Sequence, residues 1–188
     1  MASLVALQRD CYENGDSMRI VTVGGFEPKR ARKSLMKTAI QAHGDFDYVL
    51  MLDSDHTFSS INMYLLIETM EAEKLSILSA QYRARGDVSD DPVLAMIHYN
   101  DEGKLEKVRR SKAVVGLNDV EVIGLGFCVM KMDLLKDLNS KFEHCFNVAD
   151  KPQWLDDACF SYYVKKSGYR LCFDSRIKIA HLTVLPMM

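Results

Sequence analysis

The chain has 188 residues, of which 48% are hydrophobic and 27% charged, and its formal net charge is −2. This length suits a single domain over residues 1–188 with a three-layer core, and the charge balance excludes a general nucleic-acid binder, which carries a basic excess. The five cysteines form no Cys-x-x-Cys pair and no apolar run approaches the ~20 residues of a membrane span, so we expect a reduced, cytoplasmic protein with no transmembrane segment.

Helical and strand patterns alternate in the first half of the sequence. In chain order, the predicted helices and strands occupy residues 4–14, 18–23, 28–43, 48–52, 60–70 and 75–80. This alternation of α and β is typical of a parallel α/β sheet.

The predicted helix that begins at Pro28 has an unusual first turn. Four cations gather there, where the helix dipole is already positive, namely Lys29, Arg30, Arg32 and Lys33. The turn is either a solvated basic face or an end that binds a phosphate or diphosphate.

A candidate metal site follows the predicted strand over residues 48–52. Five consecutive apolar or aromatic residues indicate a strand buried on both faces, and Asp53-Ser54-Asp55 comes directly after it. Ligands of open α/β sheets bind beyond the carboxyl ends of the strands, and carboxylate oxygens suit hard cations. The alternative is an acidic turn without a ligand.

The second half of the sequence has a different pattern. A strand over 93–99, a hairpin turn over 100–103, an exposed charged segment over 104–111 and a strand over 120–123 are predicted, followed by a short helix. Gly124 and Gly126 mark a bulge or a place where a ligand approaches the backbone.

Three further acidic or imidazole side chains lie near the end of the chain. Asp156 and Asp157 open a helix that Gly168 ends, and His181 follows the last of two closing strands over 169–173 and 177–180. The acids could simply stabilise the helix dipole, and the histidine could be a satisfied residue at a strand edge.

Taken in order, these features resemble the GT-A glycosyltransferases, particularly the inverting, family-two-like group. The residues that carry the resemblance are Asp53-Ser54-Asp55, 124–127, 156–160, 168–170 and His181-Leu182, within a match from about Leu4 to His181. The resemblance implies a Rossmann-like three-layer α/β/α sandwich with a mainly parallel central sheet and a small antiparallel C-terminal part.

The resemblance also implies a metal site. Asp55, less directly Asp53, and His181 would hold Mn²⁺ or Mg²⁺ against the diphosphate of a nucleotide-diphosphate sugar. Such a cation stabilises the negative charge that grows on the leaving nucleoside diphosphate.

The resemblance assigns the remaining site residues to sugar transfer. Asp157 would be the general base for a hydroxyl of a glycan or another acceptor, and Asp156 would position or assist it. Arg32 would face the nucleotide phosphates, although Lys33 replaces the asparagine usual after it. Gly124 and Gly126 would border the sugar and acceptor pocket, and the family implies inversion at the anomeric carbon.

One departure from the family concerns the N-terminus. Members begin with a strand that precedes the first helix, whereas this sequence opens directly in the helix at Met1-Ala2-Ser3-Leu4. That strand is central in the family's sheet, so its absence leaves buried backbone groups unpaired. We therefore expect a first strand to be missing, through truncation or a misassigned start.

Two alternative functions compete with sugar transfer. In a haloacid-dehalogenase-like phosphatase, Asp53 would be a covalent nucleophile, Asp55 an acid/base, and Asp156 with Asp157 a magnesium site. Against this alternative, Asp156 follows a polar segment over 150–153 rather than a hydrophobic strand. The second alternative is a non-catalytic domain that binds a nucleotide sugar.

Overall fold

A five-stranded sheet forms the centre of the molecule. The structure is a computed structural model that describes residues 2–24, 27–84, 87, 89–100, 102–148, 151 and 153–182. The strand order is β1-β7-β3-β8-β6. These strands are β1 (Tyr48–Leu52), β7 (Phe127–Lys131), β3 (Ile77–Gln81), β8 (Cys172–Lys178) and β6 (Leu117–Asp119).

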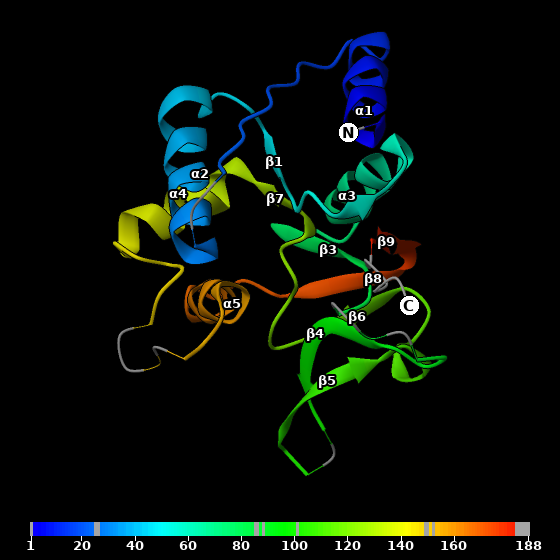
Figure 1. Cartoon of the computed structure of the whole chain (residues 1–188). Coiled ribbons are helices and arrows are strands. Elements are labelled where there is room, and N and C mark those ends of the chain that lie inside the picture. Colours follow the sequence, from blue (N-terminus) through cyan, green and yellow to red (C-terminus); the bar gives the residue numbers. More distant parts are fainter. Residues whose placement is uncertain are drawn as a thin grey trace.

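Helices cover both faces of this sheet (Figure 1). The α-helices are α1 (Ala2–Glu13), α2 (Pro28–His43), α3 (Ser60–Ala72), α4 (Met132–Lys141) and α5 (Asp156–Lys166), with a short 3₁₀ turn at Arg110–Lys112. Figure 1 shows α1 and α3 on one side of the sheet and α2 and α4 on the other. The predicted helix ends after α1 and α5 are confirmed, because Gly15 and Gly168 have φ values of 81° and 86°.

Two small antiparallel sheets accompany the central one. β4 (Val93–Tyr99) pairs with β5 (Leu105–Arg109), and β2 (His56–Thr57) pairs with β9 (Ala180–His181). The predicted hairpin turn after β4 is confirmed where it is described, since Gly103 has a φ of 73°. The second pairing matters for function, because it joins the segment after β1 to the end of the chain.

The prediction of a mainly parallel sheet is wrong. Three of the four pairings in the five-stranded sheet are antiparallel, and only β3 with β8 is parallel. β1 and β3 do run in the same direction, as a strand–helix–strand unit requires, because both are antiparallel to β7. The sequence pattern missed β7, which lies between them although it comes much later in the chain. A strand buried on both faces carries no alternation that reveals its direction.

Two further predictions of local structure differ from the structure. Residues 18–23 form no strand, and none of their side chains is buried. Val122 makes only an isolated bridge to Ile97, while the strand of this region lies earlier, at β6. The charged segment over 104–111 is exposed as predicted, apart from the buried Val108, and it also contains the strand β5, which the sequence analysis did not identify.

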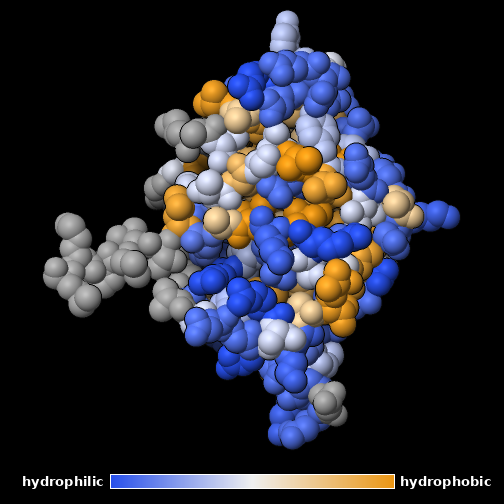
Figure 2. Space-filling view, turned by 90° about the vertical axis from the view of Figure 1, so that its right-hand side faces the viewer, coloured by the Kyte–Doolittle hydropathy of each residue, from blue (hydrophilic) through white to orange (hydrophobic). Residues whose placement is uncertain are grey.

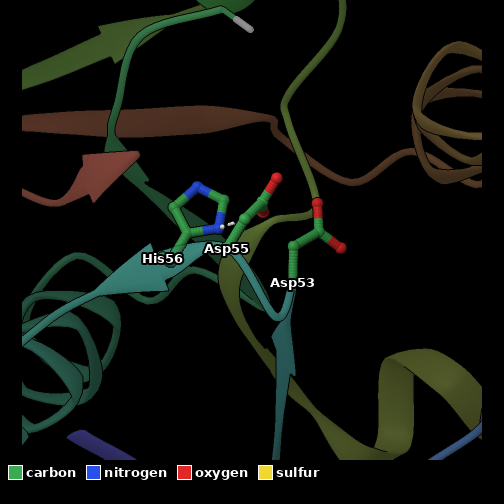
Figure 3. Close-up of side chains that lie close together, drawn as sticks. All are labelled: Asp53, Asp55 and His56. Carbon is green, nitrogen blue, oxygen red and sulfur yellow. Dashed lines mark ion pairs between the residues drawn. The ribbon is translucent and has the colours of Figure 1, made fainter. Parts of the chain in front are cut away.

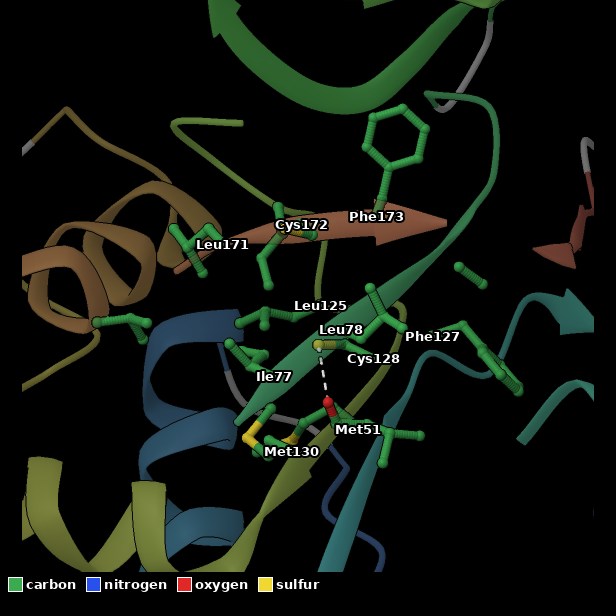
Figure 4. Close-up of a cluster of buried hydrophobic side chains, with 14 of the residues drawn as sticks. Met51, Ile77, Leu78, Leu125, Phe127, Cys128, Met130, Leu171, Cys172 and Phe173 are labelled. Atoms are coloured by element: carbon green, nitrogen blue, oxygen red, sulfur yellow. Dashed lines mark hydrogen bonds between the residues drawn. The ribbon is translucent and has the colours of Figure 1, made fainter. Parts of the chain in front are cut away.

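The core lies around β7 (Figure 4). Phe127, Cys128, Val129 and Met130 are each at most 1% exposed, so this strand is buried on both faces. Burial of each large apolar side chain stabilises the fold by ~1.5–3 kcal/mol. β7 therefore fixes the C-terminal end of its neighbour β1, where the acidic residues begin.

The surface is mixed in character. Figure 2 shows hydrophobic residues near the middle of the face that lies on the right of Figure 1, with hydrophilic residues above and below. Helix α3 carries exposed Ile61 and Leu65. Among the described helices, none combines the length and the apolar character needed to cross a membrane.

Candidate active site

The end of β1 presents three potential metal ligands. One ligand atom each from Asp53, Asp55 and His56 lies within 4.8 Å of the others. Figure 3 shows these side chains at the end of β1 and the start of β2, with Asp55 and His56 side by side. The backbone is held there because Asp53 donates its N–H to the carbonyl of Gly126 over 2.9 Å.

His56 is buried with its hydrogen-bonding capacity unused. Its side chain is 1% exposed, and neither ring nitrogen has a hydrogen-bond partner among the described residues. Burial, helped by the neighbouring His181, lowers the pKa of His56, so the ring is neutral. A buried polar group without a partner costs ~1–3 kcal/mol, and a neutral imidazole nitrogen is a common metal ligand. The donor set of two carboxylates and an imidazole fits a divalent cation.

His181 lies on the other side of Asp55. Its ring stacks on that of His56 with centroids 4.7 Å apart, and its Nε2 is 3.0 Å from Asp55 Oδ2. Its Nδ1 is 3.0 Å from the carbonyl of Arg83, which can only accept, so this nitrogen carries the hydrogen. In a neutral ring Nε2 then points a lone pair at the carboxylate. Two such acceptors at this distance need a proton or a cation between them.

Arg32 connects these ligands to the acidic start of α5. Its Nε donates to Asp156 Oδ2 over 2.5 Å and its Nη2 donates to Asp53 Oδ1 over 3.0 Å. The side chain of Arg32 is 11% exposed. Burial lowers the pKa of its guanidinium, but the negative charges of Asp53, Asp157 and Asp156 outweigh this effect and raise the pKa above its ordinary value. The guanidinium therefore donates to two carboxylates and, through Nη1, to the carbonyl of Leu125, and contact with nucleotide phosphates stays a prediction.

Asp157 differs from its neighbour Asp156. Its Oδ1 has no hydrogen-bond donor among the described residues and lies 3.9 Å from Arg32 Nη2. Burial raises the pKa of Asp157 to about 7, with Arg32 opposing and the charges of Asp156 and Asp53 adding to the rise. A carboxylate with an open oxygen and a pKa near neutrality can accept a proton from a hydroxyl group.

Gly124 and Gly126 make room for a residue that the sequence analysis missed. A Cβ at Gly124 would lie 2.0 Å from the hydroxyl oxygen of Tyr82, and one at Gly126 would lie 2.6 Å from His56 Cε1. Gly126 donates its N–H to that hydroxyl over 2.8 Å, and the buried Tyr82 ring meets His56 edge-on at 4.7 Å. Tyr82 follows β3 without any motif around it, so only the fold reveals that it supports the site.

The structure thus brings the predicted site residues to one end of the sheet. Asp53 and Asp55 lie with His56 and His181, and Arg32 joins Asp53 to the acids of α5. Three carboxylates, those of Asp53, Asp156 and Asp157, face the single guanidinium of Arg32, which leaves an excess of negative charge. A divalent cation would offset it.

Comparisons with known proteins support the fold alone. No protein-family profile matches the chain, and no curated protein matches it in sequence. A crystal structure of A197 from STIV is similar with a TM-score of 0.61 and 17% identity, over 97% of this chain and 79% of that one. A crystal structure of GalNAc-T7 with UDP, GalNAc and Mn²⁺ is similar with a TM-score of 0.56 and 12% identity, over 95% of this chain and 35% of that one. The chain therefore has a fold similar to that of a GT-A glycosyltransferase.

Proposed function

We propose that the chain is a Mn²⁺- or Mg²⁺-dependent glycosyltransferase that moves a sugar from a nucleotide-diphosphate sugar to an acceptor hydroxyl with inversion. The observation that carries the proposal is Arg32, whose guanidinium joins the metal-ligand group to the acidic start of α5. The similarity to a structure that contains UDP and Mn²⁺ adds support.

The proposed roles follow from the surroundings of each side chain. A divalent cation held by Asp53, Asp55 and the histidines would stabilise negative charge on the leaving diphosphate. Arg32 orients Asp53 and Asp156 through its hydrogen bonds. These contacts keep the two halves of the site at a fixed separation.

Asp157 is the proposed general base. It takes the proton from the acceptor hydroxyl as the acceptor oxygen attacks the anomeric carbon. The bond from that carbon to the diphosphate oxygen breaks, and the nucleoside diphosphate leaves. A pKa of about 7 matches this task, because the base is then ionised yet still able to hold the proton.

Two variants test the proposal with a panel of nucleotide-diphosphate sugars. Asp55→Ala should abolish metal-dependent donor binding, measured calorimetrically. Asp157→Asn should spare binding and lower sugar transfer by about 10²–10⁴-fold, the usual contribution of a general base. Near-full transfer by Asp157→Asn would overturn the assignment of the base.

Assays of the wild type and of Asp53→Asn distinguish the competing functions. Hydrolysis of simple phosphate monoesters that is lost in Asp53→Asn would favour a phosphatase. Binding of nucleoside diphosphates by the wild type without any turnover would favour a non-catalytic domain. Sugar transfer or metal-dependent donor hydrolysis supports the transferase.

A further inference from the structure

Helix α5, the segment before it and the end of α4 together carry a continuous row of aromatic rings. We call Trp154, Tyr162, Tyr163 and Phe142 the aromatic strip. Neighbouring ring centroids are 6.0 Å apart for Trp154 and Tyr162, 5.1 Å for Tyr162 and Tyr163, and 4.5 Å for Tyr163 and Phe142. Tyr163 and Phe142 also pack against the core, so the strip has a fixed base.

The strip is accessible to a ligand. Tyr162 is 39% exposed, and the other three rings are half-buried. Burial of all four rings would have indicated core packing. Each of the four residues is therefore partly exposed to solvent.

Two lysines lie over the strip without carboxylate partners. Lys151 Nζ is 5.9 Å from the centroid of Trp154, and Lys166 Nζ is 5.5 Å from that of Tyr162. Neither ammonium group forms an ion pair with a carboxylate in the part of the chain that is described. The strip therefore combines apolar ring surface with two positive charges that are free to meet an anion.

The strip begins beside the proposed base. Trp154 precedes Asp157 by three residues, so their Cα atoms are at most ~11 Å apart. From Trp154 the strip continues along α5 to Tyr162 and Tyr163. Tyr162 lies about 1.4 turns further along α5 than Asp157, so an acceptor with its reacting hydroxyl at Asp157 must be an oligosaccharide to contact the strip as well.

The chemistry of the strip matches one class of ligand. A sugar ring offers an apolar face of C–H groups, which suits the electron-rich face of an aromatic ring. Carboxylate or phosphate groups are attracted to ammonium groups, whereas a neutral sugar gains nothing from them. We propose that the aromatic strip, with Lys151 and Lys166, binds the acceptor and that this acceptor is an acidic saccharide. This inference rests on the proposed transferase function.

The single tryptophan of the chain provides a direct measurement. Tryptophan fluorescence is titrated with a tetramer of galacturonic acid, with a tetramer of galactose and with galactose 6-phosphate. Acidic saccharides should give a saturable change with an affinity about tenfold above that of the neutral tetramer. A stronger response to the tetrauronate indicates a carboxylated acceptor, and a stronger response to the sugar phosphate indicates a phosphorylated one.

Variants locate the binding. Lys151→Gln combined with Lys166→Gln should lower the affinity about tenfold, and Tyr162→Ala should lower it severalfold while leaving the reporter in place. Lys107→Gln, an exposed lysine on β5, is the matched control and should change nothing. Circular dichroism confirms that each variant is folded.

Three results would overturn the inference. These are no saturable change with any saccharide, equal affinity in the control and the lysine variants, or binding of anionic lipid vesicles without binding of saccharides. Donor hydrolysis with Mn²⁺ is measured on the same samples and should be unchanged. If the wild type binds saccharides but does not hydrolyse any donor, the result counts against the proposed transferase function and not against saccharide binding by the aromatic strip.

Discussion

Neighbouring carboxylates in the first turn of α5 have different chemical environments. Asp156 accepts a short hydrogen bond from Arg32, whereas Asp157 Oδ1 has no donor among the described residues. Their positions in the first turn of a helix are alike, so helix-dipole stabilisation explains either, and only the family resemblance gave them different roles. In the structure they differ through Arg32, which is 124 residues from Asp156 along the chain, and through the burial that raises the pKa of Asp157.

The raised pKa of Asp157 predicts a pH-dependent stability in the metal-free protein. Its pKa rises from an ordinary value of 3.8 to about 7 on folding, so the folded state binds more protons between these values. The contribution of Asp157 to the free energy of unfolding is therefore fully present below about pH 4 and is lost as the pH rises to 7. In Asp157→Asn this loss is absent, so the stability of the variant should rise by about 4 kcal/mol relative to that of the wild type over this interval. Thermal unfolding of both proteins across this range measures the difference, and parallel curves would show that Asp157 is not perturbed.

Substitution of the single residue Gly126 tests the proposed metal ligands. A methyl group there would meet His56 Cε1 at 2.6 Å and Asp53 Oδ2 at 3.0 Å, so Gly126→Ala should displace two potential ligands. We expect about a tenfold loss of Mn²⁺ affinity, within the 10–100-fold range for disturbed metal surroundings. Gly24→Ala is the control, since a methyl group there meets nothing within 4 Å. Equal Mn²⁺ affinity in the two variants, measured by calorimetry, would exclude His56 and Asp53 as ligands.

At the scale of elements, sequence patterns located the helices and the strands β1, β3 and β4, but they missed β2, β5, β6 and β7 and did not show how the strands of the central sheet pair. The residues of β1 and α2 were predicted as the structure has them, because a continuous apolar run and a Pro–Gly pair mark their ends. The pairing of β1 with β7 depends on a contact between distant segments, which local periodicity does not encode. The segment over 18–23 has a strand composition, yet it forms no strand in the described chain.

A matched pair of leucines tests the importance of the sheet centre. Leu78 on β3 is fully buried opposite Val129, whereas Leu105 on β5 is 54% exposed. Leu78→Ala should lower the free energy of unfolding by about 2–5 kcal/mol through lost contacts and a cavity. Leu105→Ala should change it by less than about 0.5 kcal/mol. Urea unfolding gives both values, and a similar small effect at both positions would contradict the placement of β3 in the core.

At the scale of the whole molecule, the fold gathers residues from both ends of the chain. The β2–β9 pairing places His181 beside Asp55, and α2 packs against α5 so that Arg32 reaches Asp156. The sequence suggested most of these residues because each follows or opens a predicted element. Tyr82 and the role of His56 were not predicted, because their importance arises from packing that no local motif encodes.

The central claim is that this gathered site binds a nucleoside diphosphate through a divalent cation. Thermal unfolding with a panel of nucleoside diphosphates, with and without Mn²⁺, tests it most directly. One diphosphate with Mn²⁺ should raise the midpoint of the wild type by about 5–10 °C at a hundredfold excess over Kd, and should leave Asp55→Ala unchanged. Equal shifts with and without Mn²⁺, or no shift with any diphosphate, would contradict the account.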